Sequence, residues 1–168
     1  KGFSEEDAPN FFGSFYSKTK IMAEVVLKGY DCLILRLRMP LDNKPDERNF
    51  VTKITKYKQV INLPNSITVI QDLLPAAKQL IDERKTGVYN LTNPGVMTHK
   101  EMLEIYREIV DSTHTCEFIT LEQLHSMTKA ERSNCVLNTQ KLQKEGIQLR
   151  PVKEAVRETF EEYKQYLN

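Results

Sequence analysis

The chain has 168 residues, of which 40% are hydrophobic and 28% are charged, and its formal net charge is +1. This length is enough for one domain with its own core, and the composition is that of an ordinary folded protein rather than a fibrous or disordered one. A net charge this close to zero argues against a nucleic-acid-binding surface. No apolar run reaches the ~20 residues of a membrane-spanning helix, and the N-terminus lacks a secretory signal pattern. We therefore expect a cytoplasmic protein with neither nucleic-acid nor membrane partners.

The three cysteines, Cys32, Cys116 and Cys135, lie far apart and form no C-x-x-C pair. Disulfide and zinc frameworks need closer or even-numbered spacing, so the sequence predicts free thiols, as in a reducing cytosol, and no metal site. Asn90 begins a glycosylation triplet, but it falls in a predicted buried strand, so we do not expect it to be modified.

The first 40 residues predict a helix followed by a strand. Ser14 can cap a helix that Gly29 can end. Residues 32–38 are dense in large aliphatic side chains, as in a buried strand. Met39 and Pro40 interrupt it, because proline has no amide hydrogen for ladder pairing.

The middle of the chain alternates between helical and extended patterns. The predicted elements, in chain order, are a loop at 41–48, a helix from Asn49 to about Val60 with Phe50, Ile54 and Tyr57 facing inward, a strand at 66–70, a helix from about Leu74 to Arg84 with Pro75 in its first turn, and a strand at 88–92. Asn93-Pro94-Gly95 then gives a strong turn signal.

The last third is mostly helical. Thr98 and Glu101 have the spacing of a capping box, which would open a helix. A strand at 117–119 and a short helix from Leu121 follow, and Pro151 opens the final helix. Its apolar stripe consists of Val152, Val156, Phe160, Tyr163 and Leu167. Helices that alternate with strands predict an α/β fold with largely parallel pairing, but the strands are too few for a complete doubly wound sheet.

Tyr16 and Lys20 are the candidate chemical pair. A spacing of four residues on a helix puts the phenol and the amine on the same face, one turn apart. A cation beside a phenol favours the phenolate, and such a tyrosine can give a proton to a carbonyl oxygen as hydride reaches the carbon. On spacing alone, a surface tyrosine beside a solvated lysine explains the motif equally well.

Several blocks in order resemble the extended short-chain dehydrogenase/reductases, and within that family the 3,5-epimerase/4-reductases of UDP-4-keto-6-deoxyglucose. The similarity to dTDP-4-dehydrorhamnose reductases is more distant. The blocks are Gly13-Ser14-Phe15-Tyr16-Ser17-Lys18-Thr19-Lys20, Leu37-Arg38-Met39-Pro40, Arg48-Asn49-Phe50-Val51-Thr52-Lys53-Ile54, Leu63-Pro64-Asn65-Ser66-Ile67-Thr68-Val69, Asn90-Leu91-Thr92-Asn93-Pro94-Gly95-Val96 and Arg132-Ser133-Asn134. They cover nearly the whole chain.

The resemblance implies three catalytic residues. Tyr16 would be the general acid of a C4-keto reduction, and Lys20 its partner and a contact of the cofactor ribose. Lys53 would serve epimerisation at C3 and C5, where the C4 carbonyl acidifies the protons; an exposed helix lysine remains the alternative.

The resemblance also implies binding residues. Met39 and Pro40 follow the carboxyl end of a strand, where open α/β sheets bind ligands, and would lie near the nicotinamide of NADPH, with NADH as the alternative cofactor. Asn49, Arg132 and Asn134 are candidates for the nucleotide-sugar pocket, since an arginine fork suits a diphosphate. An ordinary surface salt bridge is the alternative for Arg132.

Some of the family's features are absent. The sequence has no glycine-rich G-x-x-G-x-x-G turn, and the family's catalytic Ser/Thr and the cysteine that partners the epimerase lysine would precede Lys1. Asn138 stands where relatives often carry Asp. We therefore expect a fragment cut from a longer protein, the C-terminal half of a Rossmann-like parallel sheet plus a small α/β substrate-binding lobe. The Rossmann elements would span about 1–95, interleaved with a lobe formed by about 41–65 and 96–168.

The function expected from the resemblance is NADPH-dependent 4-keto reduction of a nucleotide sugar by the parent protein, with 3,5-epimerisation, to give a UDP- or dTDP-linked L-rhamnose. A non-catalytic nucleotide-sugar-binding or regulatory module of the same fold is the alternative. The isolated chain is expected to be inactive and marginally stable, since a sheet edge and an apolar face would need the missing half or self-association to cover them.

Overall fold

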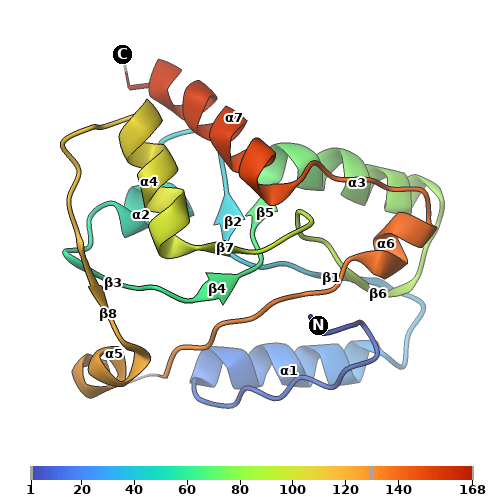
Figure 1. Ribbon diagram of the computed structural model, residues 1–168. Helices are drawn as coiled ribbons and strands as arrows, with labels where there is room; N and C mark the ends of the chain where they lie inside the picture. The colour runs from blue at the N-terminus through green and yellow to red at the C-terminus, as the bar shows by residue number, and fades with distance from the viewer. Residues whose placement is uncertain (1, 129–130, 168) are drawn as a thin grey trace.

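Helices and short strands alternate along most of the chain in the computed structural model, which describes residues 2–128 and 131–167 (Figure 1). The elements are α1 Phe15–Leu27, β1 Leu33–Arg36, β2 Pro40–Leu41, α2 Phe50–Ile54, β3 Gln59–Ile61, β4 Pro64–Asn65, β5 Thr68–Val69, α3 Ile70–Asp82, β6 Gly87–Asn90, β7 Met97–Thr98, α4 His99–Ile109, β8 Glu117–Ile119, α5 Leu121–Met127, α6 Gln140–Lys144 and α7 Val152–Gln165.

The strands form two-stranded pairs rather than one wide sheet. β1 pairs with β6, β2 with β5 and β3 with β8, all in parallel, while β4 and β7 are antiparallel. In the longest pair Leu33 lies opposite Gly87 and Arg36 opposite Asn90. Parallel strands separated by helices confirm the predicted α/β class.

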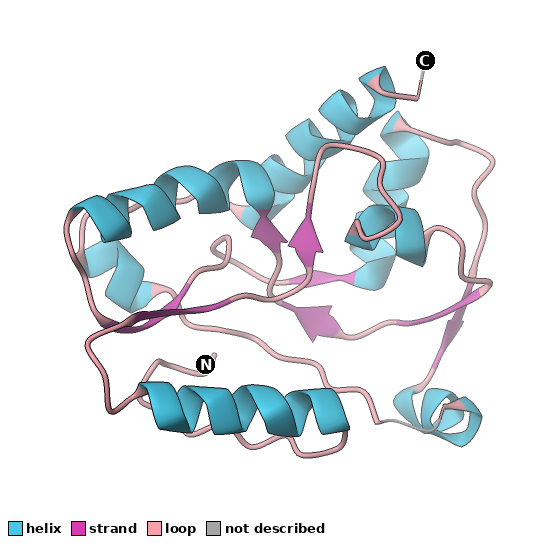
Figure 2. Cartoon of the chain, turned by 180° about the vertical axis from the view of Figure 1, so that it is seen from behind, coloured by secondary structure: helices cyan, strands magenta, loops and turns pink. Residues whose placement is uncertain are grey.

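Two apolar cores hold these elements together. In the larger one, α4 packs against α7, α7 packs against β5, and residues of β2 and β3 join the same core, in which Phe160 is fully buried. The smaller core joins α3 to β6 and α6, with Leu80 and Leu91 fully buried. From both sides of the molecule, α3, α4 and α7 lie above the strands and α1 lies below them (Figures 1 and 2).

α1 is the least covered helix. None of its residues is buried, and its apolar side chains are largely in solvent, with Phe15 83%, Met22 68% and Val25 65% exposed. Apolar helix positions normally face a core, so the residues described here leave this helix without its apolar partner.

Most capping predictions are confirmed. Ser14 and Asn49 cap α1 and α2, and Thr98 forms a capping box with Glu101 at the start of α4. α1 ends at Leu27, close to the predicted position. The strand at 117–119 and the helix from Leu121 are also present.

Several predicted boundaries are wrong. α2 ends at Ile54 rather than near Val60, because Val60 pairs with β8 as part of β3, and Tyr57 between them is 56% exposed. Leu167 lies beyond α7 and is 53% exposed, so it is not part of the buried stripe.

The structure also differs around two prolines. Pro40 does interrupt β1, but it then begins β2, a first-residue position where a strand tolerates proline. α3 begins at Ile70, so Pro75 lies inside the helix and not in its first turn. The predicted 66–70 strand is correspondingly short, with only Thr68–Val69 paired. Sequence patterns did not predict α6.

Candidate active site

The chemical pair is presented on the first two turns of α1. The Ser14 hydroxyl oxygen accepts a hydrogen bond from the Ser17 amide at 3.1 Å and so starts the helix. The Lys20 Nζ atom lies 5.4 Å from the centre of the Tyr16 ring, a cation–π distance. The structure thus confirms that the two groups share one face, and the Tyr16 side chain is 69% exposed and open to a ligand.

An ion pair fixes α1 against β1. The Arg36 guanidinium donates to both carboxylate oxygens of Glu24, at 2.6 Å and 3.0 Å. Both side chains are largely buried, and the hydrogen bond with Arg36 lowers the pKa of the Glu24 carboxyl. Arg36 also donates to the carbonyl oxygens of Ser4 and Asp7, so one side chain positions the helix, the strand and the preceding loop.

The predicted substrate segment touches the start of the same helix. The Glu131 amide donates to the Gly13 carbonyl oxygen at 3.2 Å. The approach is close enough that a Cβ atom at Gly13 would lie 2.4 Å from a Glu131 carboxylate oxygen, so only glycine fits there without a shift. Arg132 and Asn134 follow directly and are exposed. The fold therefore brings Glu131, the residue before the predicted substrate segment, to the N-terminal end of the helix that carries Tyr16.

The carboxyl end of β1 meets this segment from the other side. Arg38 donates to the Ser133 carbonyl oxygen at 2.5 Å. Met39, half-buried against the larger core, has φ 45°, a left-handed conformation that costs a non-glycine residue free energy, and Pro40 beside it is exposed. Strained backbone at the carboxyl end of a parallel strand is the expected setting for a ligand contact.

The structure gives Asn49 a different role from the predicted one. Its side-chain oxygen accepts from the Val51 and Asp42 amides, and its nitrogen donates to the carbonyl oxygens of Asp42 and Lys44. The residue is only 6% exposed, and these contacts use its hydrogen-bonding capacity. Asn49 therefore shapes the loop before α2, and we no longer assign it to the pocket.

Lys53 lies on α2 with an exposed side chain. In Figure 1 α2 lies at the height of β2 and above β3 and β4, while α1 lies below all of these strands. No ion pair joins Lys53 to another residue in the described part of the chain. The structure leaves its amine available but does not bring it to Tyr16.

The sequence interpretation did not single out three polar residues, namely the half-buried Arg38 and the buried Asn65 and His99. Burial lowers the pKa of His99 to about 4, with a further contribution from the nearby Arg38 charge. Arg38 and Asn65 belong to blocks that support the family resemblance, but nothing in the sequence shows that they meet. The Asn138 side-chain oxygen accepts from the Gln140 amide at 2.8 Å, next to Thr139, the N-cap of α6, whose own side chain makes no capping bond.

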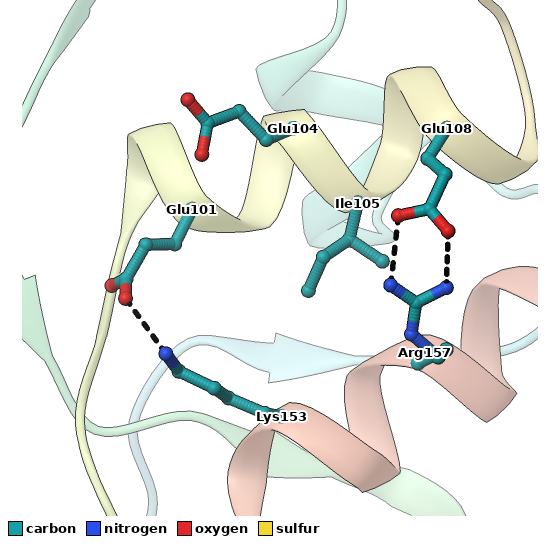
Figure 3. A pocket seen from close by; sticks show the side chains of 6 residues that line it. All are labelled: Glu101, Glu104, Ile105, Glu108, Lys153 and Arg157. Atoms are coloured by element: carbon teal, nitrogen blue, oxygen red, sulfur yellow. Dashed lines mark hydrogen bonds and ion pairs between the residues drawn. The ribbon is translucent and has the colours of Figure 1, made fainter.

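Two surface depressions lie elsewhere. One is an open groove between α4 and α7, where Lys153 pairs with Glu101 and Arg157 pairs with Glu108 above Ile105 (Figure 3). The other lies between α3 and residues 146–150. The groove between α4 and α7 is lined mainly by paired charged groups, and the other depression by both polar and apolar residues. Neither contains a predicted site residue.

The cysteines and Asn90 agree with the sequence expectations. All three cysteines are free. Asn90 is fully buried, and its side-chain nitrogen donates to the carbonyl oxygens of Phe3 and Asn138. Residues 2–128 and 131–167 contain no group of three or more His, Cys, Asp or Glu side chains that could hold a metal ion. Among the described helices, none has the length and apolar character needed to cross a membrane.

Comparison with known proteins gives a consistent set of relatives, although no family model matches the chain. A bifunctional dTDP-4-dehydrorhamnose 3,5-epimerase/reductase of Arabidopsis thaliana is 46% identical over 157 residues, which cover 92% of this chain and 52% of the relative. A trifunctional UDP-glucose 4,6-dehydratase/3,5-epimerase/reductase of the same plant is 46% identical over 159 residues, 92% of this chain and 24% of the relative.

Solved structures agree. The L780 UDP-rhamnose synthase of Acanthamoeba polyphaga mimivirus superposes with a TM-score of 0.91 at 37% identity, over 96% of this chain and 57% of that protein. A dTDP-4-dehydrorhamnose reductase of Bacillus anthracis, solved in complex with NADP, gives a TM-score of 0.76 at 19% identity, over 95% of this chain and 59% of that one, and this likeness shows the fold.

The chain spans about half the length of the bifunctional relative and of the mimivirus protein. Its α/β elements are those of a Rossmann-like reductase, as predicted. The chain is homologous to one part of the bifunctional dTDP-4-dehydrorhamnose epimerase/reductases and to the corresponding part of the trifunctional UDP-rhamnose enzymes.

Proposed function

We propose that the protein containing this chain reduces the 4-keto group of a nucleotide-linked 6-deoxyhexose. The observation that carries this proposal is the exposed pair of Tyr16 and Lys20 on α1, together with the hydrogen bond from Glu131, the residue before the Arg132–Asn134 segment, to Gly13 just before this helix. An acid, a cation and an arginine-bearing segment are the groups needed to protonate a ketone oxygen and to hold a diphosphate.

In this proposal Tyr16 donates its phenolic proton to the C4 oxygen as that carbon is reduced. Lys20, one turn along the helix, stabilises the phenolate that remains and donates to the cofactor ribose. Arg132 and Asn134 bind the nucleotide end of the substrate from their exposed positions beside the helix.

The cofactor proposed is NADPH, with NADH as the alternative, and its chemical contribution is a hydride. The residues present fit its nicotinamide–ribose end, because Tyr16 is exposed and Met39 and Pro40 lie at the carboxyl end of a parallel strand. They do not include a phosphate cradle, since the six glycines lie at 2, 13, 29, 87, 95 and 146 and form no G-x-x-G-x-x-G turn.

The uncovered face of α1 supports a further element of the proposal. A cofactor-binding half, supplied by the parent protein or by association with another chain, would pack against Phe15, Met22 and Val25, which are now exposed. The isolated chain would then be inactive and marginally stable. The three free cysteines suit a reducing, cytoplasmic location.

We also propose 3,5-epimerisation with Lys53 as the acid/base residue. Its exposed amine makes no ion pair within the described residues, so it is free to move a proton at a carbon next to the ketone. In both views α2, which carries Lys53, lies apart from α1 (Figures 1 and 2). In this proposal the substrate therefore reaches from one helix to the other, or the cofactor-binding half brings the two helices closer.

The second candidate is a module that binds a nucleotide sugar without turnover. The observation that favours it is the exposure of every proposed catalytic side chain, which leaves the site without the water-excluding walls that reduction needs.

A fusion protein separates the two candidates. Joining this chain to the part of the mimivirus protein that it does not cover would supply the cofactor half, and NADPH oxidation at 340 nm with UDP-4-keto-6-deoxyglucose would report reduction. The proposal predicts turnover, and solvent deuterium at C3 and C5 that disappears in Lys53→Met. A fusion that binds NADPH and UDP-sugar but never oxidises the cofactor would favour the binding module.

A further inference from the structure

Arg38 makes an unusual set of contacts for a largely buried arginine. Its Nε and Nη2 atoms donate to the Asn65 side-chain oxygen at 3.2 Å and 2.8 Å, and Nη2 also donates to the Ser133 carbonyl oxygen. All three contacts are with neutral oxygens. Within the described residues no aspartate or glutamate forms an ion pair with Arg38.

The surroundings do not compensate this charge. Burial is the main cause that lowers the pKa of Arg38, and the neighbouring His99 is itself held neutral. The Cys135 thiol is nearby, but burial raises its pKa, so it is also uncharged near neutral pH. Buried charges normally have a partner of opposite sign. The positive charge of Arg38 lacks such a partner among the described residues, so it can attract an anionic ligand.

Asn65 extends this contact, so that Arg38 and Asn65 together form a hydrogen-bonded clamp on residues 133–135. It is 1% exposed, and its side-chain oxygen also accepts from the Cys135 amide at 3.0 Å, while its nitrogen donates to the Leu63 carbonyl oxygen. The Ser66 amide next to it donates to the Cys135 carbonyl oxygen at 2.9 Å. One buried amide therefore joins the carboxyl end of β1 to residues 133–135, and so fixes the backbone on either side of Asn134.

We propose that Arg38 and Asn65 are positioning residues for the nucleotide-sugar pocket: they hold the Arg132–Asn134 segment in place and put an uncompensated positive charge behind it, where an anionic diphosphate binds. The diphosphate rests on the function proposed above. In this proposal the guanidinium acts through the segment rather than by touching the substrate, since its Nε and Nη2 atoms already donate to Asn65 and Ser133.

Two substitutions separate the clamp from the charge. Arg38→Met removes both, whereas Arg38→Lys keeps the charge but loses the planar fork that bonds Asn65 and Ser133 together. Arg157→Met is the matched control, because it removes an arginine whose partner Glu108 lies on the surface of the groove between α4 and α7.

The test uses the fusion protein described above and three measurements on each variant: calorimetric titration with UDP and with NADPH, amide exchange of residues 133–137, and the melting temperature. Arg38→Met is expected to weaken UDP binding at least tenfold, which corresponds to about 1.4 kcal/mol, and to speed exchange in 133–137. NADPH binding should change less than twofold. Arg38→Lys should speed exchange to the same extent but weaken UDP binding less.

Other outcomes overturn the inference. If Arg38→Met binds UDP as tightly as the parent fusion, Arg38 does not position the pocket, whatever happens to exchange. If both ligands weaken equally along with a lower melting temperature, its role is only structural. A parent fusion that binds NADPH but no UDP-sugar would instead refute the proposed function, so the two failures are distinguishable.

Discussion

The buried imidazole of His99 predicts that stability falls as the pH drops from 7 to 5. His99 is 8% exposed at the start of α4, 6.0 Å from the Phe50 ring, and its Nδ1 atom has no hydrogen-bond partner within the described chain. Burial and the Arg38 charge lower its pKa to about 4, against which a hydrogen bond to the Ile61 backbone acts only weakly. In the unfolded chain a histidine has its ordinary pKa near 6.5.

The sign follows from these two values. As the pH falls below about 6.5, His99 becomes protonated in the unfolded chain, whereas in the folded chain it becomes protonated only near pH 4. The free energy of unfolding therefore decreases between about pH 6.5 and pH 4, and His99 has no further effect below that range. At about 1.4 kcal/mol per pKa unit the full loss is about 3 kcal/mol, and about 2 kcal/mol of it appears between pH 7 and pH 5.

Urea unfolding followed by circular dichroism at pH 7 and pH 5 tests this prediction in the fusion protein with the wild-type sequence and with His99→Gln, which keeps a donor for the Ile61 carbonyl oxygen. The variant should lose about 2 kcal/mol less than the wild type between the two pH values. Carboxyl groups with lowered pKa, such as Glu101, contribute below their ordinary value of 4.5 and hardly affect this interval. Equal losses in the two proteins would refute the reasoning.

Three further stability predictions use the same unfolding assay at pH 7. Glu24→Gln should lower the free energy of unfolding by about 2–3 kcal/mol, because Arg36 is left largely buried without its carboxylate. The difference between wild type and variant should disappear as the pH falls below 4.5 through the lowered pKa of Glu24, and no loss at pH 7 would contradict this prediction. Phe160→Ala should cost about 3–5 kcal/mol, because the ring is fully buried in the larger core, and a cost below 1 kcal/mol would mean that this core is not packed as described. Arg157→Met should cost less than about 1 kcal/mol, since its pair with Glu108 is exposed; a larger loss would contradict the weak value given to surface ion pairs.

Local signals predicted the starts of α1, α2 and α4 well. Ser14, Asn49 and Thr98 cap helices because a short polar side chain satisfies an amide within three residues, and this interaction can be read from sequence. Helix ends were harder to predict. Val60 joins a strand because β8, almost 60 residues later, offers it a partner, and no local pattern contains that information.

In the candidate site, too, local features could be predicted from the sequence and long-range contacts could not. Tyr16 and Lys20 lie on one helix, so their spacing alone predicted their shared face, which the structure confirms. The contact of Glu131 with Gly13 and the clamp between Arg38 and Asn65 join residues far apart in the chain. Such contacts depend on tertiary packing, and burial rather than residue type made Asn49 a structural residue.

The central claim is that the phenol of Tyr16 supplies the proton in the reduction. The most direct measurement is the turnover number of the fusion protein with Tyr16→Phe, beside Tyr30→Phe as a control, because both tyrosines are 69% exposed and only the first has a lysine over its ring. We predict a loss of at least about 100-fold for Tyr16→Phe with NADPH binding retained, and no more than a twofold change for Tyr30→Phe. Equal turnover in the two variants would contradict the account.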